Sequence, residues 1–103
     1  MLNDQLKQQF ENDIKSNKVV IFMKGTPDQP MCGFSARSAE ILKNYGQPLK
    51  AYNVLANEEI RQGIKEFTNW PTIPQIFING EFIGGCDIVT EMHQNGDLKK
   101  MLG

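Results

Sequence analysis

The apolar run from Val19 to Met23 is the longest in the chain, and it lies between Lys18 and Lys24. A strand that is covered on both faces is continuously apolar, so this run predicts a central strand of a buried sheet. The run is far too short to cross a bilayer. Lys24 stands at the carboxyl end of the expected strand, where open α/β sheets place residues that contact ligands. A solvated lysine at a strand end is an equally good interpretation of Lys24 alone.

Helical and strand patterns alternate along the chain. Apolar residues at positions 2, 6, 10 and 14 recur every four residues and predict an amphipathic N-terminal helix. Further helices are expected over 33–45, from the N-cap residue Asn57 onward, from the capping residue Asp87 to the break at Asn95-Gly96, and over 97–102. Strands are expected over 18–24, 50–54, 75–78 and 81–83, the last two joined by a tight turn at Asn79-Gly80. Two β-α-β crossovers followed by a hairpin predict an α/β fold, with a mixed sheet and helices on both faces.

Length and charge limit the classes of partner. The 103 residues predict a single small domain over 1–103. Eleven basic and twelve acidic residues nearly cancel, without a dense run of Lys and Arg. Neither nucleic acid nor an anionic membrane is therefore expected as the main partner. The first residues lack the features of a signal or transit peptide, so we expect a cytoplasmic location unless a targeting segment has been removed.

The tetrapeptide Cys32-Gly33-Phe34-Ser35 lies where the first strand gives way to a helix. A cysteine at a helix start has its thiolate stabilised by unpaired backbone amides, and the thiolate is both the nucleophile and the metal ligand. Ser35 occupies the place of a second cysteine and cannot resolve a mixed disulfide. The alternative role of Cys32, a small buried apolar residue, is less consistent with the polar, proline-containing loop before it. Cys86 is too distant in sequence to suggest a disulfide framework.

Two further segments suggest a peptide-binding groove. An Ile73-Pro74 bond in the cis form would turn the backbone groups of Ile73 outward to pair with an extended peptide, although a plain turn into the strand fits equally well. Gly84 and Gly85 precede a helix start, which offers amides to an anion, and Asp87 offers a carboxylate to an ammonium group. Together they match an α-amino acid head, but the motif alone is common. Arg61 and Lys65 lie one turn apart on the third helix, and their pattern alone indicates solvated side chains.

Four motifs in order resemble the monothiol, CGFS-type glutaredoxins: KG at 24–25, PxCGFS at 30–35, WPTIPQ at 70–75 and GGCD at 84–87. The resemblance covers effectively the whole chain. It implies a thioredoxin-like fold with sheet order 2-1-3-4 and a cis Pro74. It also implies a glutathione site formed by Lys24, Cys32, Arg61, Ile73, Pro74, Cys86 and Asp87.

In that implied site, the backbone of Ile73 pairs with the cysteinyl unit of glutathione, and amides near Cys86 and Asp87 hold the γ-glutamyl head. Lys24 and Arg61 balance the glycyl carboxylate. Lys24 also favours the thiolate of Cys32 electrostatically.

The resemblance leaves two functions open. In the first, a [2Fe–2S] cluster is carried at a homodimer interface, held by Cys32 of each chain and by two glutathiones, since such clusters take four thiolate ligands. BolA-like proteins and apoproteins that receive clusters are then the expected partners. In the second, Cys32 removes glutathione from protein mixed disulfides, and another glutathione resolves the adduct. The resemblance favours the carrier, with at most weak glutathione-dependent oxidoreductase activity.

Overall fold

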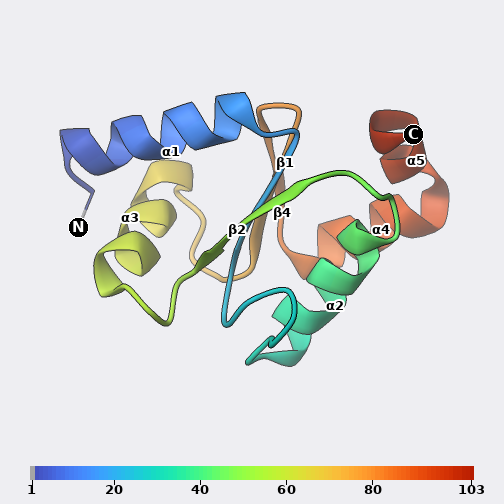
Figure 1. The fold of residues 1–103 in the computed structure, drawn as a ribbon, viewed down its shortest axis with the longest axis horizontal. Coiled ribbons are helices and arrows are strands. Elements are labelled where there is room, and N and C mark those ends of the chain that lie inside the picture. Colours follow the sequence, from blue (N-terminus) through green and yellow to red (C-terminus); the bar gives the residue numbers. More distant parts are fainter. Residues whose placement is uncertain (1) are drawn as a thin grey trace.

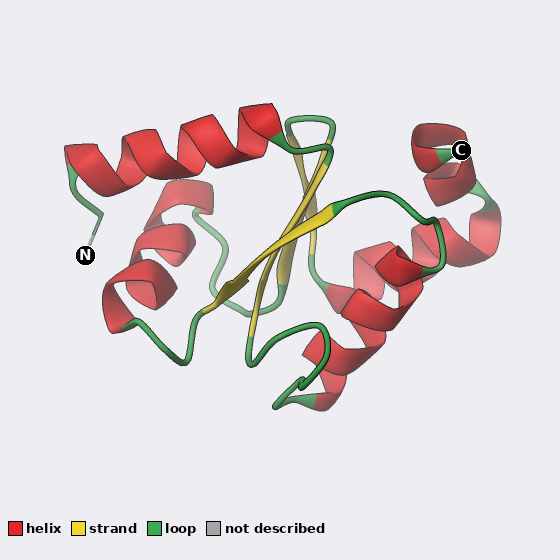
Figure 2. Cartoon of the chain, in the orientation of Figure 1, coloured by secondary structure: helices red, strands yellow, loops and turns green. Residues whose placement is uncertain are grey.

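The structure, a computed structural model, describes residues 2–103. Its helices are α1 (Asp4–Ser16), α2 (Gly33–Lys43), α3 (Glu58–Thr68), α4 (Cys86–Asn95) and α5 (Asp97–Leu102). Its strands are β1 (Val19–Met23), β2 (Leu49–Asn53), β3 (Gln75–Ile78) and β4 (Glu81–Gly84). Figure 1 follows the chain through these elements, and Figure 2 shows the strands crossing the middle of the molecule between two groups of helices.

The strands form one mixed sheet in the order β2-β1-β3-β4, which confirms the predicted thioredoxin-like arrangement. β1 is parallel to β2, as a β-α-β crossover requires. The prediction of a second such crossover is wrong, because β3 is antiparallel to β1, with Gln75 opposite Phe22. β3 thus starts beside the end of β1, and this direction brings residues 70–74 close to Lys24. The prediction failed because helix and strand patterns do not encode from which end a strand enters a sheet.

Both faces of β1 are buried, as its apolar run predicts. One face packs in a cluster with α1 and α3 that contains Phe10, Val20, Phe22, Tyr52, Ile64 and Phe77. The other packs in a cluster with α2, α4 and α5 that contains Ile21, Met23, Leu42, Ile76, Val89 and Leu98. Complete burial of one such side chain stabilises the fold by about 1.5–3 kcal/mol. These two layers cover both faces of β1, and the loops at its carboxyl end therefore extend from a strand that is packed on both sides.

The turn between β3 and β4 agrees with the prediction. Asn79 and Gly80 have φ values of 53° and 84°, the left-handed conformation that a two-residue hairpin turn requires. α2 is shorter than expected and ends at Lys43, because the following N–H groups bond three rather than four residues back, as Tyr45 does to the carbonyl of Leu42.

The start of α4 also differs from the prediction. Gly85 is the N-cap residue and Cys86 the first helical residue, so Asp87 lies in the first turn and is not the cap. A side chain at position 85 would place its Cβ atom 3.2 Å from the carbonyl oxygen of Pro74. Glycine therefore allows the helix start to approach residues 70–74 closely. Asp87 still lies at the positive end of the helix, where a carboxylate is favoured.

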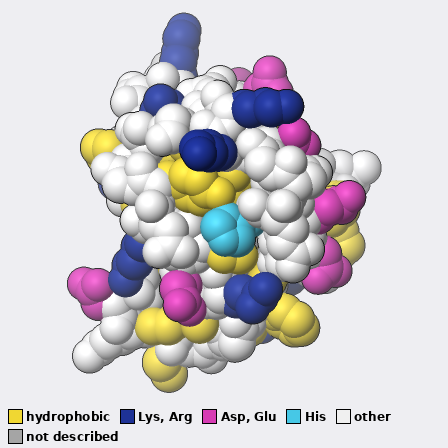
Figure 3. Space-filling model, turned by 90° about the vertical axis from the view of Figure 1, so that its right-hand side faces the viewer, with side chains coloured by type: hydrophobic (Ala, Val, Ile, Leu, Met, Phe, Trp, Pro, Cys, Tyr) yellow, Lys and Arg dark blue, Asp and Glu magenta, His cyan; other side chains and the backbone are white. Residues whose placement is uncertain are grey.

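The surface over α2, α4 and α5 carries both signs of charge, scattered between small apolar patches (Figure 3). His93 lies on this side, and its Nδ1 atom is 2.6 Å from the hydroxyl of Tyr45, which links the segment after α2 to α4. Within residues 2–103, no helix combines the length and the apolar character needed to cross a membrane.

Candidate functional site: a groove at the end of β1

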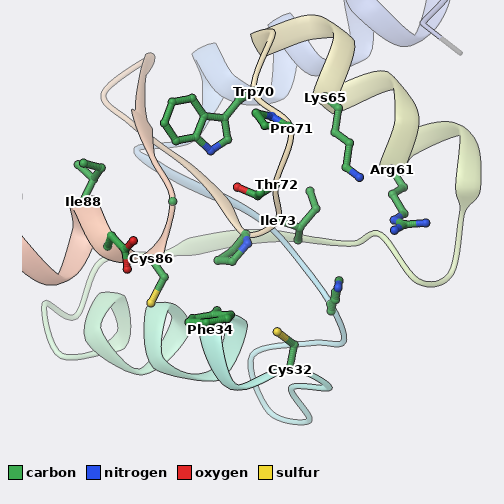
Figure 4. A pocket seen from close by; sticks show the side chains of 14 residues that line it. Cys32, Phe34, Arg61, Lys65, Trp70, Pro71, Thr72, Ile73, Cys86 and Ile88 are labelled. Atoms are coloured by element: carbon green, nitrogen blue, oxygen red, sulfur yellow. The ribbon is translucent and has the colours of Figure 1, made fainter.

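A groove of about 660 Å³ opens at the carboxyl end of β1. It lies between the starts of α2 and α4, one side of α3 and residues 70–74 (Figure 4). Its lining residues are Lys24, Cys32, Phe34, Arg61, Lys65, Trp70, Pro71, Thr72, Ile73, Pro74, Gly85, Cys86, Asp87 and Ile88. All seven residues that the resemblance assigns to a glutathione site are among them. The structure thus gathers residues that are up to 63 positions apart, from Lys24 to Asp87, around one cavity.

Cys32 is the N-cap residue of α2, with extended backbone at φ −155° and ψ 139°, and its side chain is half-buried. The pKa of its thiol is lowered, chiefly by the backbone N–H of Ser35. The N–H of Phe34, the charge of Lys24 and the hydroxyl of Ser35 add to this effect, while partial burial opposes it. A thiolate at this position is therefore accessible from the groove and favoured by the helix start.

Ser35 is part of the framework beneath the groove. Its side chain is fully buried, and its hydroxyl oxygen accepts a hydrogen bond from the backbone N–H of Lys24 at 3.0 Å. The first turn of α2 is thereby tied to the end of β1. The sequence identified Ser35 only as a missing cysteine, because nothing in the local pattern shows that its hydroxyl meets Lys24.

The loop between β1 and Cys32 closes on itself. The N–H of Met31 donates to the carbonyl of Lys24 at 2.9 Å, so the loop returns beside the strand that it left. Gly25 has a φ of 89°, and a Cβ atom there would lie 2.5 Å from the carbonyl oxygen of Gln29. Asn53, at the end of β2, accepts from the N–H of Gly25 at 3.0 Å. Lys24 and Cys32 are therefore held at one rim of the groove by backbone contacts.

The α3 side of the groove is basic. Arg61 and Lys65 extend from α3 toward the cavity, opposite Cys86 (Figure 4). The guanidinium of Arg61 lies 3.6 Å from the carboxylate of Glu58, and the Nε atom of Arg61 is buried without a hydrogen-bond partner in residues 2–103. That unpaired donor suits an anionic ligand. The sequence pattern indicated that Arg61 and Lys65 were simply solvated, and only the position of α3 shows that both line the groove.

The α4 side offers amides and a carboxylate. Cys86 is buried, and its sulfur lies 3.9 Å from the hydroxyl oxygen of Thr90. Asp87 is exposed in the first turn of the helix. The unpaired N–H groups at this helix start favour an anion, and the carboxylate of Asp87 favours a cation. A ligand head that carries both charges, as an α-amino acid does, fits this end.

An apolar rim forms part of the edge of the groove, at the starts of α2 and α4 and at residue 70. Phe34, Trp70 and Ile88 are 64%, 38% and 37% exposed, which is unusual for side chains of this size. The bond between Ile73 and Pro74 is cis, as the resemblance implied. The sequence did not indicate this rim, since an apolar side chain in a helix or a loop usually belongs to the core.

Metal-binding clusters are not found within the described chain. Among residues 2–103, no group of three or more His, Cys, Asp and Glu side chains is placed to hold a metal ion. Both cysteines line the groove, Cys32 half-buried and Cys86 buried.

Comparison with known proteins agrees with this geometry. The glutaredoxin family model matches residues 19–83. The chain is 57% identical over 97 residues to glutaredoxin-related protein 5 of Danio rerio, a mitochondrial protein, with 93% of this chain and 63% of that protein covered. It is 53% identical over 105 residues to the mitochondrial monothiol glutaredoxin-5 of Schizosaccharomyces pombe, with 99% and 72% covered. The chain thus spans less than two thirds of the length of the first relative.

Solved structures of glutaredoxins have the same fold as this chain. The solution structure of reduced poplar apo GrxS14 superposes with a TM-score of 0.81 at 49% identity, covering 92% of this chain and 87% of that one. A crystal structure of a buckwheat glutaredoxin–glutathione complex has a TM-score of 0.81 at 29% identity, covering 93% and 86%.

The expected cytoplasmic location is contradicted by the relatives named above, which are mitochondrial proteins. The expectation relied on the first residues of the chain, but Asn3 already caps α1 by accepting from the N–H of Leu6 at 2.8 Å. These residues take part in the fold, and their composition does not indicate the compartment. The fold, the CGFS motif and the relatives agree on one assignment: the chain belongs to the glutaredoxin family, and within it to the monothiol glutaredoxins.

Proposed function

We propose that this monothiol glutaredoxin acts in iron–sulfur cluster biogenesis, binding a [2Fe–2S] cluster and transferring it to apoproteins, with residues 1–103 acting as one glutaredoxin domain. The observation that carries the proposal is a single accessible cysteine at the groove. Cys32 is half-buried with a lowered pKa, whereas Cys86, the other cysteine, is buried. A soft thiolate is the ligand type that iron–sulfur clusters prefer.

The number of ligands argues for a shared cluster. A [2Fe–2S] cluster takes four thiolates, and Cys32 supplies one from each chain. Two chains therefore supply two ligands, and two glutathione thiols supply the others. This count requires a homodimer bridged by the cluster, with a glutathione bound beside each Cys32.

The groove has complementary groups for each part of glutathione. Lys24 and Arg61 are the cations for the glycyl carboxylate, and the backbone of Ile73 pairs with the cysteinyl unit beside Pro74. Amides at Cys86, together with the carboxylate of Asp87, hold the γ-glutamyl head. The shared placement of these residues around one cavity supports this assignment. The buckwheat glutaredoxin, crystallised with glutathione, shares the fold.

Protein partners follow from the same site. We expect a BolA-like protein to take the place of one protomer, and apo iron–sulfur proteins to receive the cluster. The exposed rim of Phe34, Trp70 and Ile88 at the groove supports protein contacts at this face. Neither nucleic acid nor a membrane is proposed as a partner.

The lowered pKa of Cys32 also favours a second function, the reduction of protein mixed disulfides with glutathione. In this reaction the Cys32 thiolate attacks the glutathione sulfur, forms a Cys32–glutathione disulfide and releases the protein thiolate. A second glutathione thiolate then attacks that disulfide, which regenerates Cys32 and yields glutathione disulfide. Ser35 takes no part in these exchanges, so a single thiol is sufficient.

One experiment separates the two functions. Wild type and Cys32→Ser are reconstituted with iron, sulfide and glutathione, and each is followed by visible absorption and size-exclusion chromatography. The proposal predicts a coloured wild-type dimer that loses its colour when glutathione is removed, and a colourless, folded variant. Full absorption in Cys32→Ser, or a dimer that persists without glutathione, would contradict the shared-cluster arrangement. A colourless wild-type monomer that rapidly reduces glutathionylated protein would favour the reductase.

A further inference from the structure

Gln75, the first residue of β3, is a polar side chain in the middle of the fold. It is fully buried and does not line the groove. A buried amide is costly unless its donors and acceptor are paired, so its partners show what the side chain holds in place.

The partners of Gln75 are all in the segment that precedes it. Its Nε2 atom donates to the carbonyl oxygens of Trp70 at 2.9 Å and of Thr72 at 3.1 Å. Its Oε1 atom lies 2.8 Å from the hydroxyl oxygen of Thr68, at the end of α3. The two carbonyl oxygens can only accept, so they require the NH₂ group, and this leaves one orientation for the amide.

These bonds determine one side of the groove. Residues 70–73 all line the cavity and form its wall between α3 and β3 (Figure 4). The N–H of Trp70 is held in turn by the carbonyl of Lys65 at 3.2 Å and by the hydroxyl of Thr68 at 3.2 Å. The N–H of Trp70 is thus held by α3, and Gln75 holds the carbonyls of Trp70 and Thr72.

We propose that Gln75 is a positioning residue for glutathione: through the carbonyls of Trp70 and Thr72, its amide sets the groove wall against which the tripeptide binds. The inference rests on the proposed function only in that glutathione is the ligand of the groove. Gln75 does not touch the ligand, and its effect passes entirely through the backbone of residues 70–73.

Gln75→Glu is the sharpest test, because it retains the shape of the side chain and removes the two donors. A carboxylate would face two carbonyl oxygens, so the wall would have to move away from it. We expect glutathione to bind about tenfold more weakly, the loss typical of a broken buried hydrogen bond. The rate at which iodoacetamide alkylates Cys32 should change little, since the backbone amides that lower its pKa belong to α2 and not to residues 70–73.

The fluorescence of Trp70 reports how tightly residues 70–73 are held. It is the one tryptophan of the chain and lines the groove, so glutathione titrations can be followed by its fluorescence. Quenching of Trp70 by acrylamide should increase in Gln75→Glu even without ligand, because the segment is less tightly held. Circular dichroism establishes that the variant is folded.

Tyr52→Phe is the matched control. It removes a buried hydroxyl that bonds to Asp13 and Gln9, away from the groove. It should lower stability but leave glutathione affinity and Trp70 quenching unchanged. If Gln75→Glu does not fold, Thr68→Val replaces it, since it removes the hydroxyl that contacts both Gln75 and Trp70 while retaining the side-chain shape.

The outcomes separate the role of Gln75 from the proposed function. Wild-type affinity and quenching in whichever of the two variants folds would overturn the role of Gln75 and leave the proposed function intact. Failure of the wild-type protein itself to bind glutathione would overturn the proposed function, and the inference with it.

Discussion

The hydroxyl of Ser35 accepts a hydrogen bond from the backbone N–H of Lys24 at 3.0 Å, and Ser35 is fully buried. Ser38, one turn further along α2, is equally buried, but its hydroxyl has no hydrogen-bond partner among the described residues. The residue that stands in place of a second cysteine is therefore a structural link between the end of β1 and the first turn of α2.

Ser35→Ala should destabilise the fold by about 1–3 kcal/mol, since it leaves the part-buried N–H of Lys24 unpaired. Ser38→Ala is the matched control and should be close to neutral. Urea denaturation followed by Trp70 fluorescence measures both. Equal losses in the two variants would show that the bond from Lys24 to Ser35 contributes nothing.

The pH dependence of Cys32 alkylation should reflect the helix start. The thiolate is the reactive form, so a lowered pKa keeps Cys32 reactive at pH values where an ordinary thiol is protonated. Iodoacetamide rates measured against pH in a Cys86→Ser background should give a midpoint below that of a free cysteine thiol measured in the same way. Lys24→Ala should retain most of the lowering, because the N–H of Ser35 is its largest cause. A midpoint restored to the ordinary value by Lys24→Ala would assign the effect to charge instead.

Cys86→Ser should retain most of the cluster and most of the glutathione affinity. Cys86 is buried, its sulfur lies 3.9 Å from the hydroxyl oxygen of Thr90, and in the proposed site only its backbone contacts glutathione. Visible absorption after reconstitution, compared with wild type, measures the cluster. A loss as large as that of Cys32→Ser would indicate a site with two cysteine ligands in each chain.

The double variant Lys24→Ala with Arg61→Ala should lower cluster occupancy, although neither residue contacts iron. Each exposed charge pair with the glycyl carboxylate contributes only ~0.2–1 kcal/mol, so a single substitution is expected to be mild. Lys99→Ala with Lys100→Ala removes the same charge from α5, distant from the groove, and is the control. Size-exclusion chromatography with absorbance detection compares the coloured dimers. Equal occupancy in the two double variants would remove Lys24 and Arg61 from the glutathione site.

Stability should fall in strongly alkaline solution because of Tyr52. Burial, together with a hydrogen bond to Asp13, raises the pKa of Tyr52 to about 12. In the unfolded chain the value is near ~10, so its contribution is complete below that pH and is lost as the pH rises through about 12. Urea denaturation across this range should show the decline, and Tyr52→Phe should reduce it. An unchanged decline in the variant would assign the effect to other groups.

Much of the fold could be predicted from local patterns. An apolar run indicated that β1 is buried on both faces, and Asn79-Gly80 indicated the hairpin, because each pattern depends on a few neighbouring residues. The motifs around Cys32, Ile73 and Asp87 likewise identified residues that the structure brings to one groove. Local sequence was sufficient wherever the backbone conformation or the chemistry of a short segment decides the outcome.

What the sequence by itself determined is the set of elements, the cysteine at the start of α2 and the family. The tertiary structure alone decided that β3 runs antiparallel to β1, that Lys65 lines the groove, and that Gln75 holds the backbone of residues 70–73. Each of these three features depends on how elements that are separate in the sequence pack against one another. These contacts form when α3 packs against the sheet. The apolar periodicity of one segment shows which of its faces is buried, but it does not show which other segment packs against that face.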